Sequence, residues 1–454
     1  MPHRNEDLNL STDNKIKPTL YSVYIIMQLF STAIAILLGF SLSRLAAAPV
    51  PDLQILFMDS NMWKQPVGEV LNKRSHLRFH WLSKAKNDAR STTKGLRLWQ
   101  QPVGETILRS RDGKLHSFEI SIYNRGDMGN INTDTFDKLT SKWQKLLQSK
   151  TGKDGEKMNR TQKGSVVSAD RWLWECPGAY ITLTASSTGR GSKKLPEFLK
   201  LTLVSVKFGK EMFASRGGIT NTMVKRNDLK DSVEKQSNGD VFIKNIPMVD
   251  QGRKGYCAVA SAERVFRYYG LQVDQHAMAQ IAQSSAQGGT NPLKMIDALK
   301  RVAGRTKTRL YQHYEIDRRE SASTIKAYNR LAKKSNHRQL PENVYYQQFL
   351  SVAHAETLKS VRSKGSTYNR FKKTIIDKIN EGIPLLWALQ VGVIKERGIP
   401  QAGGGHMRLI IGYNEKSDQI IYSDSWGAGH EFKKMTFPEA FTASMNLMTI
   451  KPSR

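Results

Sequence analysis

The sequence predicts an α+β protein in which strands and helices occupy separate stretches of the chain. Short alternating patterns dominate residues 55–215, one amphipathic helix pattern follows residue 256, and apolar strand patterns return after residue 406. Such segregation favours helices packed on antiparallel sheets rather than a regular βαβ repeat. A length of 454 residues is enough for about two or three domains with their own cores.

The composition is strongly basic and poor in cysteine. Lys and Arg number 70 against 40 Asp and Glu, giving a formal charge of +30, of which residues 1–240 carry +14 and residues 241–454 carry +16. Such a surface attracts anionic lipid, acidic polymer and nucleic acid alike, so the charge alone does not identify a partner. The two cysteines exclude a disulfide-dense scaffold and a cysteine-built zinc or iron–sulfur site.

An uncharged apolar segment covers residues 20–43. A helix of that length, rising about 1.5 Å per residue, would cross a hydrocarbon core of about 30 Å. More basic residues precede the segment than close it, so we expect residues 1–19 to stay in the cytoplasm. We predict a transmembrane anchor. A cleaved signal ending at Ala46-Ala47-Ala48 is an alternative that also puts residues 52–454 in the periplasm or outside the cell, and a buried helix is a third reading.

Residues 55–215 are predicted to form a β-rich α+β domain. Period-two alternation predicts strands at 115–123, 180–184 and 201–206, and apolar residues at helical spacing predict a helix at 136–147. This domain shows no recognisable site, and its role stays open. The polar residues 216–240 that follow are predicted to be a linker.

A nucleophile candidate stands at the start of the next helix. Apolar residues from Val259 to Tyr269 fall on one face, and Gly270 is a natural stop, so Cys257 lies at the helix N-terminus. Unpaired N–H groups and the helix dipole favour a thiolate there, and the nearby Arg253 and Lys254 act in the same direction. A thiolate in that place is a ready nucleophile.

A base and its orienting carboxylate are predicted far downstream. Gly403-Gly404-Gly405 precede His406 at the mouth of the strand pattern 407–413, and a second strand pattern, 419–423, ends at Asp424. Two adjacent strands joined by a short turn would place His406 and Asp424 side by side. That is the relation between a catalytic base and the carboxylate that orients it.

The order Gln251, Cys257, His406, Asp424 resembles the papain-like cysteine peptidases, most of all the bacteriocin-processing (double-glycine leader) peptidase domains, which use Asp as third residue. The resemblance covers residues 241–445 and implies a papain-like domain over 241–454, with the nucleophile helix packed on an antiparallel sheet. By this resemblance Cys257 is the nucleophile, His406 the general base and acid, and Asp424 the orienting group. Gln251 would form the oxyanion hole with the Cys257 backbone N–H, and Trp426 would shield the histidine.

Two features depart from that family. The sequence around the nucleophile is Tyr256-Cys257-Ala258, where papain has Cys-Gly-Ser-Cys-Trp and the bacteriocin processors have Cys-Gly-Pro, which leaves the subfamily and substrate open. Residues 301–380 carry a net +12 and read as helices. One interpretation is a basic cap that binds an acidic peptide or an anionic surface. The other is an ordinary solvated helical face.

Each candidate also has an ordinary explanation. In an exported chain Cys176 and Cys257 could form a disulfide, although we expect Cys176 to be a structural core thiol. His430 is the competitor of His406 but follows Asp424, outside the family order. We expect no cofactor and no metal, because no metal-ligand spacing relates His276, His313, His337 and His354.

The leading interpretation is a membrane-associated, exported cysteine peptidase that hydrolyses peptide bonds through a Cys-His-Asp triad and an acyl-enzyme. A transglutaminase-like acyltransferase or a cell-wall amidase with the same triad is the first alternative, and a non-catalytic basic protein that binds the cell envelope is the second. The expected partners are a peptide or protein substrate, the membrane through the N-terminal helix, and an anionic surface or polymer. Nucleic acid is disfavoured, because no basic–aromatic module occurs.

Overall fold

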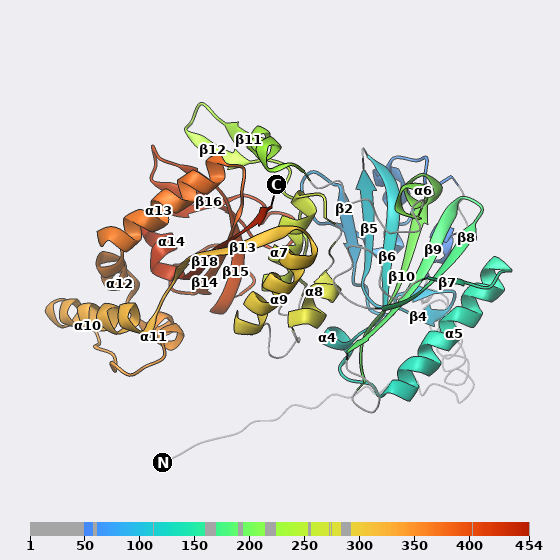
Figure 1. Cartoon of the computed structure of the whole chain (residues 1–454), viewed down its shortest axis with the longest axis horizontal. Helices are drawn as coiled ribbons and strands as arrows, with labels where there is room; N and C mark the ends of the chain where they lie inside the picture. Colours follow the sequence, from blue (N-terminus) through green and yellow to red (C-terminus); the bar gives the residue numbers. More distant parts are fainter. Residues whose placement is uncertain are drawn as a thin grey trace, which may run out of the picture. The chain divides into compact units, whose positions relative to one another are not determined.

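The computed structural model describes residues 50–57, 61–111, 113–158, 169–188, 194–213, 224–252, 256–271, 273, 275–282, 292–401 and 403–453. Residues 51–454 form one compact unit. This unit contains two eight-stranded sheets, each with its own hydrophobic cluster (Figure 1). We call residues 51–213 the N-terminal lobe and residues 224–454 the C-terminal lobe.

The N-terminal lobe is built on an antiparallel sheet with strand order β1-β2-β5-β6-β10-β9-β8-β7. Its strands are β1 (His80–Trp81), β2 (Asp88–Ser91), β5 (Thr106–Arg111), β6 (Lys114–Asn124), β7 (Glu156–Met158), β8 (Ala169–Cys176), β9 (Ala179–Thr188) and β10 (Leu195–Ser205), with a separate hairpin of β3 (Arg97–Leu98) and β4 (Gln101–Pro102). Its helices are α2 (Gln54–Phe57), α3 (Val67–Asn72), α4 (Arg125–Met128), α5 (Thr133–Thr151) and α6 (Val206–Phe213), with a 3-10 turn η1 (Ser75–Leu77).

Local sequence signals explain the elements of this lobe. The stretches 115–123, 180–184 and 201–206 fall on β6, β9 and β10, as their alternation predicts, except that residue 206 begins α6. Helix α5 begins where the Asn132 side chain accepts a hydrogen bond from the Thr135 N–H at 2.8 Å and ends at Gly152, whose φ is 70°. It buries Phe136, Trp143 and Leu147 in the core of the lobe.

The C-terminal lobe has a second antiparallel sheet with strand order β11-β12-β15-β14-β18-β13, to which β16 and β17 add beside β15. Its strands are β11 (Val233–Lys235), β12 (Asp240–Ile243), β13 (Thr308–Glu315), β14 (Leu385–Val391), β15 (Gly404–Asn414), β16 (Gln419–Ser423), β17 (Lys433–Thr436) and β18 (Ser444–Pro452). Its helices are α7 (Cys257–Tyr268), α8 (Gln275–Ala282), α9 (Pro292–Arg305), α10 (Arg318–Lys334), α11 (Tyr346–Val352), α12 (Ala355–Arg362), α13 (Gly365–Asn380) and α14 (Phe437–Ala443), after a 3-10 turn η3 (Arg226–Ser232).

Helix α7 packs on this sheet and runs beside β15 (Figure 1). The helix begins at Cys257 and is followed by Gly270 at φ 78°, as the sequence predicts. The Ser261 hydroxyl donates to the Met407 carbonyl of β15 at 3.1 Å, a buried contact that fixes the helix on the strand. The α+β class and the helix-on-antiparallel-sheet arrangement are therefore confirmed.

Three expectations need comment. The range 216–240, predicted to be a linker, contains η3 and β11, and β11 pairs with β12 at the edge of the second sheet. The range 301–380 is not wholly helical, because residues 308–315 form β13 against β18. In the part of the chain that the structure describes, no helix is long and apolar enough to span a membrane; the predicted span at 20–43 lies outside that part.

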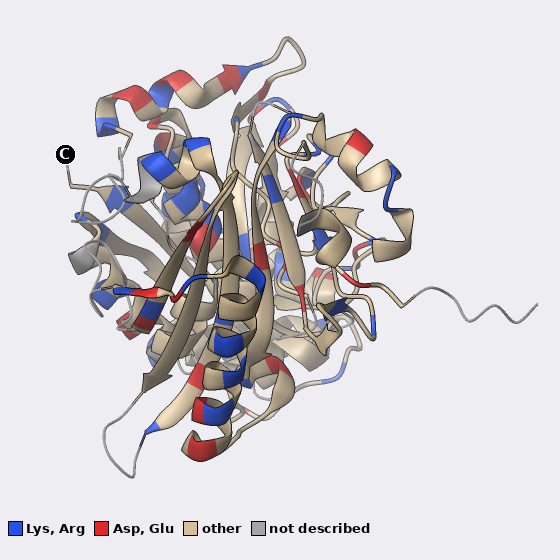
Figure 2. Ribbon diagram, turned by 90° about the vertical axis from the view of Figure 1, so that its right-hand side faces the viewer, with Lys and Arg blue, Asp and Glu red and all other residues tan. Residues whose placement is uncertain are grey.

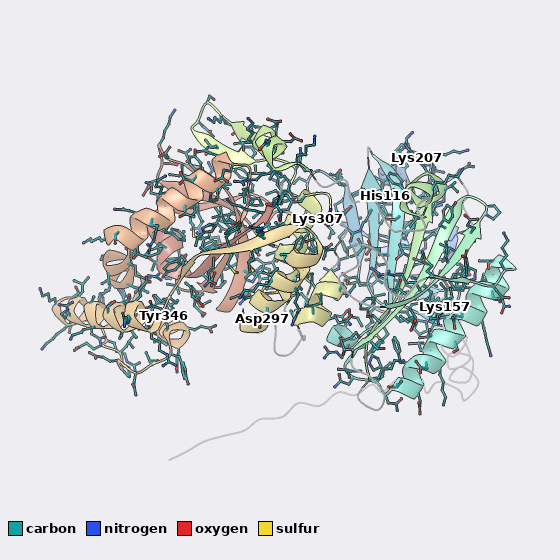
Figure 3. All side chains as sticks on the ribbon, in the orientation of Figure 1. His116, Lys157, Lys207, Asp297, Lys307 and Tyr346 are labelled. Atoms are coloured by element: carbon teal, nitrogen blue, oxygen red, sulfur yellow. The ribbon has the colours of Figure 1, made fainter. Side chains whose placement is uncertain are left out.

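The basic charge is distributed as the sequence suggests. Lys and Arg lie on helices, strands and loops of the described residues and not on one segment (Figure 2). The N-terminal lobe places Lys157 on β7 and Lys207 on α6, and the C-terminal lobe places Lys307 just before β13 (Figure 3). Charge therefore does not locate the functional site, which has to be found from side-chain geometry.

Candidate active site

The first component of the site is Cys257, the first residue of α7. Its side chain is half-buried and is a free thiol. No side chain caps this helix end. The sulfur therefore lies where the backbone N–H groups of the first turn point, an environment that favours negative charge.

The second and third components are His406, at the start of β15, and Asp424, directly after β16. The His406 Nε2 lies 2.6 Å from the Asp424 Oδ1, and both side chains are fully buried. The two strands pair in antiparallel register, with Leu409 opposite Ser423, so the beginning of one strand meets the end of the other. The other ring nitrogen, Nδ1, has no oxygen or nitrogen partner among the described residues.

The protonation of the histidine depends on both of its neighbours. Burial alone would lower the pKa of His406, but the hydrogen bond from the ring to the Asp424 carboxylate and the influence of the neighbouring Cys257 raise this pKa to about 9. Burial alone would raise the pKa of Asp424, but His406 and Arg408 hold it below its usual range. The site therefore stabilises an imidazolium between a carboxylate and a sulfur.

A buried arginine that the sequence analysis did not single out holds the far side of Asp424. The Arg408 Nε donates to the Asp424 Oδ2 at 2.6 Å, and its Nη1 donates to both carboxylate oxygens of Glu396, at 3.0 and 2.9 Å. The Tyr422 hydroxyl donates to the same Glu396 at 2.5 Å, and the guanidinium lies 4.7 Å from the Tyr422 ring centroid. The network therefore fixes the carboxylate that orients His406.

The signal for Arg408 was present in the sequence. Alternate residues of a strand point to the same face, so a charged residue two positions after His406 shares its face. Because the residue stands within an apolar strand pattern, its burial next to a carboxylate was the only reading that leaves its charge paired. Glu396 gave no comparable signal, because it lies in the irregular segment between β14 and β15.

A second buried arginine links the nucleophile helix to the same carboxylate segment. Arg264 of α7 donates to the backbone carbonyls of Pro247 at 2.8 Å and Asp424 at 3.0 Å, and to the Ser423 hydroxyl at 2.5 Å. It is 1% exposed. One guanidinium thus joins the Cys257 helix, the end of β16 and the segment that leads to Gln251.

The fourth predicted residue, Gln251, is buried beside the segment after Asp424. Its Oε1 accepts a hydrogen bond from the Ser425 hydroxyl at 2.7 Å, and its backbone N–H donates to the Ser425 carbonyl at 2.8 Å. Since the amide oxygen faces Ser425, the amide NH₂ points away from it. The Trp426 ring stacks on the His406 ring, with centroids 4.4 Å apart and planes 12° apart. The ring of His430, the competing histidine, contacts the edge of Trp426, and the His430 backbone carbonyl accepts a hydrogen bond from the Asp424 N–H at 2.8 Å.

The N-terminal lobe reaches the loop that carries Gln251. Arg90 of β2 forms a buried ion pair with Glu105 at 2.5 Å and a second with Asp250 at 2.8 Å. Gly252 adopts φ +63°, and a Cβ there would collide with the Arg90 guanidinium. Residues 253–255, including the predicted Arg253 and Lys254, lie outside the described residues.

The two cysteines are not paired in the structure. Cys176 ends β8 in the N-terminal lobe and packs against the core of that lobe, whereas Cys257 packs against the core of the other lobe. Burial raises the pKa of the Cys176 thiol. The disulfide alternative is therefore wrong for this structure.

Gln251, Asp424 and His406 lie in one continuous set of contacts, and Cys257 affects the pKa of His406. Gln251 joins Asp424 through Ser425, Asp424 joins His406 directly, and His406 is influenced by Cys257. A helix-borne cysteine beside a buried histidine–carboxylate pair is an arrangement able to perform acyl transfer through a thioester. This arrangement resembles that of the papain-like cysteine peptidases.

The family comparison agrees with this class. Residues 320–448 match the model of the Peptidase_C39 like family. This match confirms the resemblance predicted from the sequence and supports a cysteine peptidase. The matched segment contains His406 and Asp424 and begins after Cys257. The comparison with curated proteins gave no match.

The chain is also similar to solved structures of low sequence identity. One is the peptidase domain of Streptococcus ComA, a bi-functional ABC transporter involved in quorum sensing, with 14% identity, 46% of this chain and 99% of that chain covered, and a TM-score of 0.24. Another is a double glycine motif protease from an AMS/PCAT transporter in complex with the leader peptide, with 12% identity, 46% and 92% covered, and a TM-score of 0.24. A third is xylellain, a cysteine protease from Xylella fastidiosa, with 13% identity, 51% and 91% covered, and a TM-score of 0.25.

Proposed function

We propose that the chain is an exported, membrane-associated cysteine peptidase that hydrolyses peptide bonds through Cys257, His406 and Asp424. The observation that supports this most is the His406 ring, buried between a carboxylate at 2.6 Å and the thiol that opens α7, with its pKa raised to about 9. At neutral pH such a ring is protonated. A protonated ring is able to give a proton to a leaving amine, as the proposed reaction requires.

In the proposed reaction the Cys257 sulfur attacks the carbonyl carbon of the scissile bond, and the carbonyl electrons move to the oxygen. The oxyanion accepts hydrogen bonds from the Gln251 side chain and the Cys257 backbone N–H. As the oxyanion collapses, the C–N bond breaks and His406 gives its proton to the leaving amine, so a thioester and a neutral ring remain.

Water then resolves the thioester. The neutral His406 takes a proton from the attacking water, the new carboxyl product forms, and the thiolate leaves as the ring returns to its protonated state. Asp424 keeps the ring oriented through both halves of the reaction. Arg408 and Glu396 keep Asp424 ionised and in place.

The experiment that tests this function uses a peptide library and isotopic water. We expect the exported part of the chain, residues 52–454, to cleave library peptides at new termini, with ¹⁸O entering the new carboxylate when the reaction is run in H₂¹⁸O. The Cys257→Ala variant is the matched control and should give no products. Products joined to an added amine and lacking ¹⁸O would instead identify an acyltransferase. An absence of both kinds of product would favour the non-catalytic protein that binds the cell envelope.

The export and anchoring belong to the same proposal and are supported by the uncharged segment at residues 20–43. We expect an alkaline phosphatase fused after residue 51 to be active in a bacterial host and to remain in the membrane fraction. Replacing the two central apolar residues Ile34 and Ile36 by Lys should prevent stable membrane insertion. The fusion should then either leave the membrane fraction or remain in the cytoplasm. Activity in the soluble exported fraction would show a cleaved signal.

A further inference from the structure

An open cavity of about 450 Å³ lies next to the Arg408 network. Its wall comes from the segment between β14 and β15, from Tyr422 at the end of β16 and from β17. The polar side chains of that wall are mainly cationic: Lys395, Arg397, Lys433 and Lys434, with the carboxylates of Glu396 and Glu439. Its volume is in the range of sites that hold one or two amino-acid side chains.

The acidic groups of this wall are already engaged. Glu396 is held by Arg408 and Tyr422, and Glu439 accepts hydrogen bonds from the Thr436 N–H at 2.9 Å and hydroxyl at 2.8 Å as a capping box for α14. Both carboxylates are therefore held by other groups, although the charge of Glu396 still acts on Lys433.

Three of the four cations have no acidic partner in the described part of the chain. Lys434 is paired with Asp240 at 2.7 Å, but Lys395, Arg397 and Lys433 form no ion pair with a described carboxylate. The Lys433 ammonium makes only a long hydrogen bond, 3.4 Å, to the Gly398 carbonyl. Burial and the charge of Arg408 lower the pKa of Lys433, so an anion beside it would relieve an unfavourable environment.

The cavity is close to the reacting groups. Glu396, in its wall, bonds Arg408, and Arg408 bonds Asp424 at 2.6 Å, so two side chains separate the cavity from the His406–Asp424 pair. The segment after β14, the start of β15 and the end of β16 also lie toward the same end of the sheet. An extended peptide advances about 3.3 Å per residue, so a side chain three residues from the scissile bond lies about 10 Å from it.

We propose that this cavity is a subsite for the acidic side chains of a peptide substrate, bound by Lys395, Arg397 and Lys433. The inference rests on the proposed function and adds the substrate class: peptides with one or more Asp or Glu a few residues from the bond that is cleaved. We assign the carboxylate to the substrate chain because the wall of the cavity is linked to Asp424 through Glu396 and Arg408. Charge-assisted hydrogen bonds to Arg397 and Lys433 supply the recognition.

The test measures binding without cleavage. The Cys257→Ala chain of residues 52–454 is titrated against two fluorescent peptides of the same length, one with three Glu and one with Gln at the same places, and anisotropy is recorded at 50 and 500 mM NaCl. We expect the Glu peptide to bind about tenfold more tightly at low salt and to lose this advantage at high salt.

Two matched variants decide whether the cavity is responsible. Arg397→Glu with Lys433→Glu should abolish the preference for the Glu peptide, and the milder Arg397→Gln with Lys433→Gln should reduce it while keeping the fold. Arg330→Glu with Lys333→Glu changes the net charge by the same amount at exposed positions of α10 and should leave the preference unchanged.

Equal losses in the cavity and α10 variants would overturn the proposal, because the preference would then come from overall charge. No preference in the unsubstituted chain would overturn it as well. These binding results do not depend on catalysis, since the chain carries Cys257→Ala. Cleavage by the wild-type chain without any preference for Glu would contradict the subsite but not the proposed peptidase activity.

Discussion

One histidine in each lobe lies near a buried arginine and its carboxylates, and the two differ in protonation. Burial and the nearby Arg109 lower the pKa of His116, on β6 (Figure 3), to about 4. Asp424 and Cys257 instead overcome burial and raise the pKa of His406, on β15, to about 9. In the N-terminal lobe the carboxylates bind the arginine, and Asp88 and Glu119 only partly offset its charge at His116. In the C-terminal lobe one carboxylate bonds the histidine directly while Arg408 holds its other oxygen.

This difference shows what makes a histidine functional in a basic protein. Proximity to a carboxylate is not enough, because Asp88 and Glu119 pair with basic side chains and neither forms a hydrogen bond with His116 among the described residues. Asp424 divides its two oxygens between His406 and Arg408, so one remains for the ring. Substitutions in the two lobes test whether Asp424 divides its oxygens in this way.

Removing either histidine gives the sharpest contrast. We expect His406→Ala to lower kcat by about 10⁴-fold or more, because the general acid and the partner of the thiolate are lost together. We expect His116→Ala, with a similar loss of volume in the other lobe, to leave kcat within about threefold. Peptide cleavage followed by mass spectrometry measures both. Comparable losses in the two variants would mean that His406 acts only through the fold.

Removing Arg408 tests the buried network. Arg408→Met leaves the carboxylates of Asp424 and Glu396 buried and without their shared cation, so we expect a loss of about 3–5 kcal/mol in the free energy of unfolding. Arg397→Met removes an exposed guanidinium from the neighbouring segment and should change this free energy by less than about 0.5 kcal/mol. Urea unfolding at pH 7 compares them. If the two variants are equally stable, the network does not hold Asp424.

The pH dependence should separate the two histidines. The folded pKa of His406 lies above its ordinary value, so its contribution to stability is complete below about 6.5 and is lost as the pH rises through about 9. The folded pKa of His116 lies below its ordinary value, so the unfolded chain binds the extra proton and stability is lost as the pH falls from about 6.5 toward 4.

Asp424→Asn keeps a hydrogen-bond acceptor for the ring but removes the charge. We expect the alkaline limb of kcat to move down from about pH 9 by about one to two pH units. The acid limb of the unfolding curve should stay in place in this variant and disappear in His116→Phe. Denaturation midpoints and kcat measured between pH 4 and pH 10 give both limbs. An unmoved alkaline limb in Asp424→Asn contradicts the role given to the carboxylate.

The smallest expected effect comes from the contact between the lobes. Arg90→Gln removes the ion pair with Asp250, the residue before Gln251, and we expect kcat to fall by about three- to tenfold with little change in KM. Loss of the oxyanion donor itself, in Gln251→Ala, should cost more, about 10²-fold or more. Arg74→Gln, another buried arginine of the N-terminal lobe, is the control and should leave kcat unchanged. Equal effects of the Arg90 and Arg74 variants on kcat would mean that the Arg90–Asp250 ion pair contributes only to stability.

Much of this fold follows from local sequence patterns. Alternation located β6, β9 and β10, and helical spacing with a terminal Gly located α7. The strand β13 was missed because its residues, Thr308 to Glu315, include few apolar side chains, and their strand form depends on pairing with β18 far along the chain.

The site could be predicted only in part. Cys257, His406 and Asp424 could be named because each stands at the end of a predictable helix or strand, whereas Gln251, in the segment between β12 and α7, was named from the resemblance to a known family. The supports of these groups were not predictable from order. Arg264 and Arg90 act by tertiary contacts with Asp424 and Asp250 over more than a hundred residues of sequence, and no local pattern marks such pairs.

The central claim is that Cys257 and His406 form an activated pair, and thiol alkylation tests it most directly. Iodoacetamide labelling of residues 52–454 is followed by mass spectrometry from pH 5 to 9, with Cys176 as the internal reference thiol in the same molecule. The account predicts that Cys257 reacts much faster than Cys176 at pH 6, where an ordinary thiol is protonated, and that His406→Ala removes this advantage. Equal labelling of the two cysteines, or fast labelling of Cys257 that survives His406→Ala, would contradict it.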